Sequence, residues 1–283
     1  MSHTFTLPAA DGYAIPLTLF ARDDLRDACG DCLLIHPALG VRASFYNAFA
    51  EALSQQGHCV LVLEQRGQGS SALRAAHHVD YGYAELCDDL HRAVTWLARH
   101  YPQRRRFLLG HSLGGQLGIA YSAMHNSSLH GLVTLASANP HWRHYRGFTR
   151  WQLFGLQWLT PVLCRTLGYF PGDRLGFGGR EARGLMHDWL QLVRHNRFVA
   201  LRPDLNQRLQ RLRLPLLSIG FNQDSFAPIG PVRALGALLE NATIEHAQFD
   251  AHRLGTVADH FAWAKKPQAV VQHIHHWLQQ QPS

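Results

Sequence analysis

Short apolar runs alternate with amphipathic segments along most of this chain, and this alternation constrains its fold more than any other feature. The runs fall at 32–36, 59–63, 107–110, 132–136 and 214–220, with a weaker one near 242–244. Continuous apolar runs of this length are typical of parallel strands buried on both faces. Helical spacing of apolar residues is seen at 43–57, 83–100, 113–124, 231–239 and 267–279. The pattern predicts an α/β protein with a mostly parallel sheet and helices on both faces.

A predicted hairpin precedes this alternation, and one long segment interrupts it. The hairpin has strands at 4–7 and 14–20 with a turn between them. From 140 to 213 the sequence is rich in Trp and Arg, is typical of helices, and contains no buried strand-like run. We therefore expect residues 1–139 and 214–283 to form one α/β core, with residues 140–213 inserted as a helical cap or lid.

Composition excludes several classes of protein. Of the 283 residues, 46% are hydrophobic and 17% are charged, which argues against a disordered chain. No apolar stretch of about 18 residues suggests a membrane-spanning helix. The first residues lack a basic segment followed by an apolar one, so no signal peptide is expected. The five cysteines, an odd number, favour a reducing compartment over a disulfide framework. We expect a soluble, cytoplasmic protein.

The formal charge of +7 raises the question of an anionic partner. The arginines are scattered and no nucleic-acid-binding motif accompanies them, so we expect no nucleic-acid partner. The 20 histidines lack Cys or carboxylate partners at metal-binding spacing, so no metal is expected. No sequence pattern indicates an oligomeric state.

The strongest chemical signal is the G-x-S-x-G pattern at 110–114 (GHSLG), placed between a predicted strand and a predicted helix of small residues. This is the context of a nucleophile elbow, in which flanking glycines let strand and helix approach without a Cβ clash. The helix N-terminus also stabilises negative charge beside the hydroxyl group. We predict that Ser112 is a nucleophile.

A serine nucleophile needs a base in hydrogen-bond reach and a carboxylate that orients this base. In enzymes with this elbow the acid and then the histidine follow the serine along the chain. Asp224 lies just past the carboxyl end of the predicted strand 214–220, where α/β sheets place catalytic groups. Asp250 is the alternative, but it follows a less certain strand. We favour Asp224.

The choice of the base is less direct, because several histidines occur late in the chain. His260 is favoured because a loop position before the last helix lets its imidazole reach over the edge of the sheet. His252 is the second choice. Four further histidines are weaker candidates, three of them within the terminal helix: His246, His273, His275 and His276.

A serine hydrolase also needs N–H donors aimed at the developing oxyanion. One is the backbone N–H of Leu113, the residue after the nucleophile. The second should come from the loop after the strand 32–36. Pro37 has no N–H, which makes Ala38 the first suitable donor.

Together these residues resemble the α/β-hydrolase superfamily. Within it, they resemble bacterial hydrolases related to serine aminopeptidases and monoacylglycerol lipases. The resemblance rests on motifs along nearly the whole chain: 110–115 (GHSLGG), 36–38 (HPA), 66–70 (RGQGS), Asp224 with Pro228, and 260–261 (HF).

This resemblance implies an eight-stranded, mostly parallel sheet with a lid, the triad Ser112, Asp224 and His260, and an oxyanion hole from Ala38 and Leu113. Two positions depart from the pattern of the family. Glu64 and Gln65 stand where relatives often carry an aspartate, and Asp259 stands where they usually have glycine. A second carboxylate beside His260 is expected to perturb this imidazole.

The chemistry that follows is hydrolysis of a carboxylic ester or thioester through an acyl-enzyme, without a metal or organic cofactor. A peptidase or acyltransferase would use the same triad. A non-catalytic binding protein of this fold is disfavoured because no member of the triad is missing.

The insertion supplies a hypothesis about the substrate. Four aromatic residues, interleaved with Arg143, Arg146, Arg150 and Arg165, are expected to line an apolar acyl pocket under the lid: Trp142, Trp151, Phe154 and Trp158. Alternatively, these aromatic side chains simply pack on the core. Arginines at the rim would attract an anionic head group or membrane surface, so peripheral membrane contact is an expected partner interaction. The expected substrate is a small ester or thioester with an apolar acyl chain.

Overall fold

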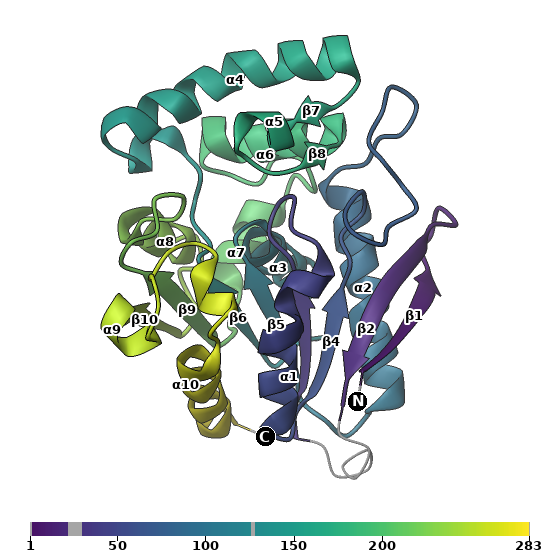
Figure 1. The fold of residues 1–283 in the computed structure, drawn as a ribbon, viewed down its shortest axis with the longest axis vertical. Helices are drawn as coiled ribbons and strands as arrows, with labels where there is room; N and C mark the ends of the chain where they lie inside the picture. Colours follow the sequence, from purple (N-terminus) through teal and green to yellow (C-terminus); the bar gives the residue numbers. More distant parts are fainter. Residues whose placement is uncertain (1, 22–29, 126–127, 283) are drawn as a thin grey trace.

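The computed structural model describes residues 2–21, 30–125 and 128–282, and an eight-stranded sheet lies at its centre (Figure 1). The strands lie in this spatial order: β1 (Ser2–Pro8), β2 (Ala14–Phe20), β4 (Cys59–Leu63), β3 (Cys32–His36), β5 (Arg106–His111), β6 (Gly131–Leu135), β9 (Leu216–Phe221) and β10 (Ile244–Phe249). The pairs β1–β2 and β2–β4 are antiparallel, and all other neighbours are parallel. The predicted hairpin and mostly parallel sheet are confirmed.

The central strands are apolar throughout because both faces of the sheet are covered. In β3, Cys32 and Leu34 belong to one buried core, while Leu33 and Ile35 belong to the other. This alternation follows from the pleat, which points successive side chains to opposite faces. Helices α1 (Asn47–Gln55) and α10 (Gln268–Gln280) cover one face, and α2 (Tyr83–His100), α3 (Leu113–Met124) and α7 (Leu205–Arg211) cover the other (Figure 1).

A further layer, which we call the upper layer, lies over the end of the sheet at which the parallel strands finish (Figure 1). It consists of α4 (Gly147–Leu167), β7 (Phe170–Pro171), α5 (Gly172–Leu175), β8 (Arg180–Glu181) and α6 (Arg183–His195). The remaining short elements are η2 (Ala43–Tyr46), η3 (Trp142–His144), α8 (Ile229–Gly236), α9 (Ala251–Leu254) and η4 (Ala262–Ala264).

Two details of the segment 140–213 differ from the expectation of a purely helical insertion. β7 and β8 pair as a small antiparallel ladder, which at two residues each is too short to produce a sequence pattern. α7 belongs to the same segment but packs against α3, on a face of the sheet rather than above it. Within the described residues, no helix combines the length and the apolar character needed to cross a bilayer.

The cysteines carry no cross-link in the part of the chain that the structure describes. Cys32, Cys59, Cys87 and Cys164 are buried and take part in no disulfide. Cys29 lies outside the described residues.

A buried ion pair ties the antiparallel edge of the sheet to α2. The guanidinium of Arg66, which follows β4, donates to both carboxylate oxygens of Asp89 in α2, at 2.7 and 2.8 Å. It also donates to Asp11 in the β1–β2 turn. Arg66 and Asp89 are both almost completely buried. Because neither side chain reaches water, the charge of each is stabilised by the opposite charge of its partner.

We predict that Asp89→Asn lowers the free energy of unfolding by about 3–5 kcal/mol, because it leaves the buried Arg66 guanidinium only partly neutralised. Asp88→Asn is the matched control: the neighbouring carboxylate pairs with Arg92 at the surface, and its loss should cost less than about 1 kcal/mol. Urea denaturation measures both. Equal losses would show that burial of the Arg66 pair is not what stabilises this edge.

Candidate active site

Ser112 lies at the turn from β5 to α3 with a strained backbone, at φ 52° and ψ −112°. The turn is possible because its neighbours lack side chains. A Cβ atom on Gly110 would lie 2.4 Å from the carbonyl carbon of Gly114, and a Cβ on Gly114 would lie 2.2 Å from the carbonyl oxygen of His36. The Ser112 N–H donates to the Leu135 carbonyl at 2.9 Å, which fixes the turn to β6. This is the geometry of a nucleophile elbow.

Asp224 and His260 form a buried pair at the ends of two other segments. His260 Nδ1 lies 2.7 Å from Asp224 Oδ2. Asp224 follows β9, and its Oδ1 accepts the backbone N–H groups of Phe226 and Ala227, both at 2.8 Å. These contacts fix the carboxylate, which in turn places the proton of a neutral imidazole on Nδ1 and leaves Nε2 as an acceptor.

The alternative acids and bases have other contacts. Asp250 Oδ1 accepts the Arg253 N–H at 2.8 Å and so caps α9. His252 is an exposed residue of the same short helix. Neither lines the cavity that Ser112 and His260 share. The structure therefore brings Asp224 and His260 together, as predicted from chain order, and leaves their competitors outside.

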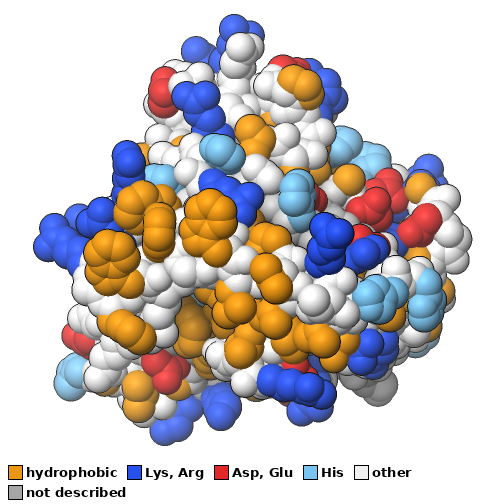
Figure 2. Space-filling view, turned by 90° about the horizontal axis from the view of Figure 1, so that it is seen from above, with side chains coloured by type: hydrophobic (Ala, Val, Ile, Leu, Met, Phe, Trp, Pro, Cys, Tyr) orange, Lys and Arg blue, Asp and Glu red, His pale blue; other side chains and the backbone are white. Residues whose placement is uncertain are grey.

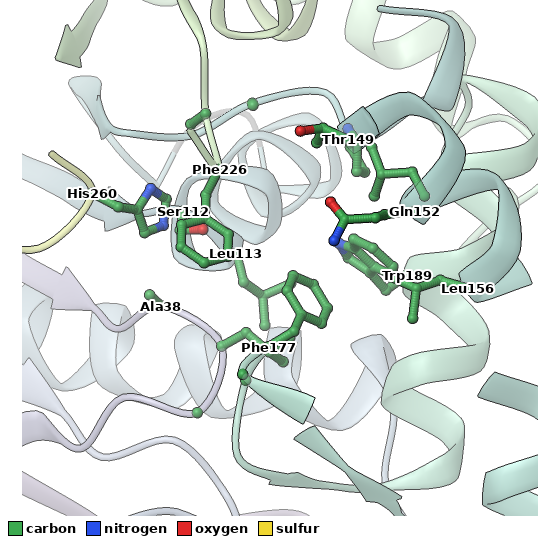
Figure 3. A pocket seen from close by; sticks show the side chains of 18 of the residues that line it. Ala38, Ser112, Leu113, Thr149, Gln152, Leu156, Phe177, Trp189, Phe226 and His260 are labelled. Atoms are coloured by element: carbon green, nitrogen blue, oxygen red, sulfur yellow. The ribbon is translucent and has the colours of Figure 1, made fainter. Parts of the chain in front are cut away.

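A cavity of about 840 Å³ separates the core from the upper layer, and it contains both Ser112 and His260. Seen from above, it opens as a hollow surrounded by hydrophobic side chains (Figure 2). Figure 3 shows Ser112 and His260 at one side of the cavity and Thr149, Gln152 and Leu156 of α4 at the other. The lining is mostly apolar, and no Asp, Glu, Lys or Arg contributes to it within the described residues.

The four aromatic residues predicted to line the acyl pocket do not line it. Trp142, Trp151, Phe154 and Trp158 are absent from the cavity wall. Trp151 and Trp158 point to solvent, while Trp142 packs against Phe154 with ring centroids 5.3 Å apart. For Trp151, Phe154 and Trp158 the reason is the rotational phase of α4, and Trp142 precedes this helix, in η3. The cavity-facing side of α4 carries smaller or aliphatic side chains: Thr149, Gln152, Leu153, Gly155, Leu156 and Leu159.

The predicted oxyanion donors differ in their availability. The Leu113 N–H lies in the first turn of α3, where N–H groups have no intrahelical acceptor. The Ala38 N–H, in contrast, donates to the hydroxyl of buried Tyr46 at 2.9 Å. Ala38 does line the cavity, but its N–H is already used, so the prediction for Ala38 needs correction.

The next N–H along this loop, that of Leu39, has no hydrogen-bond acceptor in the part of the chain that the structure describes. Leu39 also lines the cavity beside Ser112. Tyr46 is held in place by a second contact, since its hydroxyl lies 2.8 Å from His111 Nδ1. Burial lowers the pKa of His111 well below its usual range, so the neutral ring accepts the tyrosine proton. Sequence reasoning missed this arrangement because no sequence pattern shows that the Tyr46 hydroxyl turns back to the Ala38 N–H and also meets His111.

The two departures from the family pattern have structural roles. Glu64 accepts the Ala43 N–H at 2.8 Å and the Ser70 N–H at 3.0 Å, and so joins the loops that follow β3 and β4. Asp259 accepts the N–H groups of Phe261 and Ala262, at 2.8 and 2.6 Å. Its carboxylate therefore caps η4. From the sequence this carboxylate is expected to perturb His260, and its capping role is not predicted.

Glu181 is a buried carboxyl group that connects the upper layer to the loop after β4. It accepts the Gly179 N–H at 2.7 Å and lies 3.3 Å from the Gln68 amide nitrogen. The segment it fixes contacts the loop after β3, because a Cβ on Gly40 would lie 2.2 Å from the Gly179 nitrogen. Burial raises the pKa of Glu181 to about 7. No cluster of three or more metal-ligating side chains occurs among the described residues.

Comparison with known proteins places this chain in a family. The family described as serine aminopeptidase, S33, matches residues 28–242. A protein of Pseudomonas syringae pv. syringae named carbamate hydrolase RutD is 27% identical over 231 residues, which cover 78% of this chain and 86% of that protein. A monoacylglycerol lipase of Mycolicibacterium smegmatis is 30% identical over 116 residues, or 41% of this chain and 40% of the lipase.

Solved structures share the fold. A thermostable carboxyl esterase from Bacillus coagulans superposes with a TM-score of 0.70 at 13% identity, covering 98% of both chains. At this level of identity the likeness concerns the arrangement of strands and helices.

We predict that Glu181→Gln removes a pH-dependent loss of stability. The folded pKa of about 7 exceeds the ordinary carboxyl value of 4.5, so the stabilising effect of the protonated form is full below pH 4.5 and is lost as pH rises through 7. The unfolding free energy of the variant minus that of the wild type should therefore increase by about 2 kcal/mol between pH 5.5 and pH 8. A difference that does not change with pH would contradict this prediction.

Proposed function

The chain belongs to the serine aminopeptidase, S33, family of α/β-hydrolases, and within this family we propose that it is a serine hydrolase that cleaves carboxylic esters or thioesters of neutral, apolar acids. The observation that supports this most is the shared cavity. A strained serine at an elbow and a histidine held by a buried aspartate open onto the same apolar space.

In the proposed mechanism, Ser112 Oγ attacks the acyl carbonyl while His260 Nε2 accepts its proton. The imidazolium is stabilised by Asp224, whose second oxygen is fixed by two backbone N–H groups. His260 then protonates the leaving alcohol or thiol. Water, deprotonated by the same imidazole, attacks the acyl-enzyme and releases the acid and the free serine.

We propose that the oxyanion is stabilised by the N–H groups of Leu113 and Leu39. Leu39 replaces Ala38 in this role, because the Ala38 N–H donates to Tyr46. The Tyr46 hydroxyl, bound to His111, then acts as a positioning group that turns the loop so that the next N–H faces the cavity. Each well-placed donor of this kind is worth about 10²–10³ in kcat.

The cavity supports an ester substrate over a peptide. An aminopeptidase must bind the charged α-amino group of its substrate, and burying such a charge without a carboxylate partner is costly. No acidic residue lines the cavity within the described residues. The apolar wall and the volume of about 840 Å³ also suit a long acyl chain better than a small carbamate, so among the named relatives the monoacylglycerol lipase is the closer functional parallel.

We also propose that the upper layer, which forms most of the segment 140–213, acts as a cap on this site. Helix α4 and the segment 170–178 supply much of the cavity wall, with Trp189 of α6 (Figure 3). Their role would be to exclude water from the acyl-enzyme and to contact the acyl chain.

We predict that Asp224→Asn lowers kcat for p-nitrophenyl octanoate by about 10³–10⁴-fold, because asparagine neither stabilises imidazolium nor fixes the tautomer. Asp250→Asn is the matched control and should change kcat less than threefold, since Asp250 only caps α9. Circular dichroism checks that both variants are folded. Comparable losses in the two variants would overturn the assignment of the acid.

We also expect kcat/KM to rise with the length of the acyl chain, from acetate to decanoate esters. Each buried methylene contributes about 0.8 kcal/mol, so three more methylenes should raise kcat/KM roughly tenfold or more. Leu156→Ala, in the cavity wall, should reduce this preference, while Thr166→Ala, at the exposed end of the same helix, should not. The highest kcat/KM for acetate would sink the proposal of an apolar acyl site.

A further inference from the structure

Helix α4 carries apolar side chains on its cavity side and also on the side that faces away from the protein. The inner face buries Leu153, Gln157, Thr160 and Cys164. The outer face, on the other side of the helix by 100° spacing, carries four large apolar residues with most of their surface in solvent: Phe148 (77%), Trp151 (63%), Trp158 (71%) and Val162 (58%). A helix that only covers a core would place polar side chains on this outer face.

The exposed face is continuous with the entrance of the cavity. Four residues both line the cavity and are exposed at its rim: Leu159, Leu175, Phe226 and Phe261. We call these eight residues the mouth surface. Figure 2 shows hydrophobic side chains gathered around the hollow, over the upper layer. Contiguous apolar areas of this kind on a water-soluble surface mark an interaction site.

Basic residues without acidic partners surround the mouth surface. Arg143, Arg146, Arg150 and Arg165 make no ion pair with a carboxylate within the described part of the chain. Arg143 and Arg150 instead lie over the Trp142 ring, 5.1 and 4.9 Å from its centroid. The sequence of α4 contains no Asp or Glu. The α4 side of the cavity entrance therefore carries basic groups that no carboxylate pairs with in the described part of the chain.

From this pattern we propose that the mouth surface docks on an anionic phospholipid bilayer. Tryptophan and phenylalanine enter the apolar boundary of a bilayer, and arginines around them contact the lipid phosphates. A second copy of the chain is a poorer occupant, because two such faces would bring unpaired arginines against each other. The docked orientation places the cavity entrance against the membrane. This inference deepens the proposed function, on which it rests for the idea that an apolar acyl substrate enters there.

The test uses the full-length Ser112→Ala protein, so that binding is measured without turnover. Its partition onto vesicles of phosphatidylcholine alone, or with 30% phosphatidylglycerol, is measured by co-sedimentation. The variant pairs added to it are Trp151→Ala with Trp158→Ala, and Arg146→Gln with Arg165→Gln. Arg99→Gln with Arg213→Gln is the matched control, because it removes the same charge at the other end of the sheet, where α2 finishes and β9 begins. Thermal melting checks that every variant is folded.

We expect binding to the anionic vesicles, with affinity lowered at least tenfold by each mouth-surface pair and less than twofold by the control pair. An arginine near a charged membrane contributes about fivefold per residue, so the arginine variant should also show a weaker salt dependence than the tryptophan variant. A Trp151→Phe and Trp158→Phe pair should retain most of the binding, because the apolar area is kept.

Three results would overturn the proposal: no partition onto anionic vesicles, an equal loss in the control pair, or a dimer in sedimentation velocity that disappears in the tryptophan variant while vesicle binding is unchanged.

Failure of the docking proposal is separate from failure of the proposed function. If Ser112→Ala remained an active esterase but bound vesicles as expected, only the catalytic assignment would fall. If vesicles were not bound while the kinetics held, only the docking proposal would fall.

Discussion

The geometry of the site depends on one close backbone contact. Where β5, α3 and the loop after β3 meet, there is no space for a side chain at Gly114. A Cβ atom on Gly114 would lie 2.2 Å from the His36 carbonyl oxygen. Because backbone meets backbone there, Ser112 is placed by the packing of the central strands rather than by its own side-chain contacts. The positive φ of Ser112, 52°, is a local cost that the surrounding sheet holds in place.

The loops around Ser112 are positioned by polar groups that are themselves buried. Tyr46 uses its hydroxyl to bind both the Ala38 N–H and His111, and Glu64 joins the loops after β3 and β4. Glu181 fixes Gly179, which lies against Gly40 in the loop after β3, and also contacts Gln68 in the loop after β4. Unmet hydrogen-bonding groups in a dry interior are costly, so these contacts make the loop conformations specific. The cavity can then remain apolar, because the polar groups that shape it point away from it.

Much of this arrangement could be predicted from the sequence, and the exceptions have physical reasons. Continuous apolar runs predicted the central strands. The serine elbow, together with the order of acid and base along the chain, predicted that Asp224 and His260 lie close to each other. The strand near 242–244 is instead β10 (Ile244–Phe249), because an edge strand alternates and lacks a continuous apolar run. The phase of α4 was not predictable, since both of its faces are apolar and composition does not show which one packs inward. The use of the Ala38 N–H depends on Tyr46, a contact made only in the folded chain.

The central claim is that Ser112 forms a covalent acyl-enzyme with the help of His260. The most direct measurement is mass spectrometry of the protein after reaction with an alkyl fluorophosphonate, followed by mapping of the modified peptide. We predict one adduct per chain, on the peptide that contains Ser112, absent from Ser112→Ala and formed at least 10²-fold more slowly in His260→Ala, while His252→Ala reacts like the wild type. An adduct on another residue, or unchanged labelling of Ser112→Ala, would contradict this account.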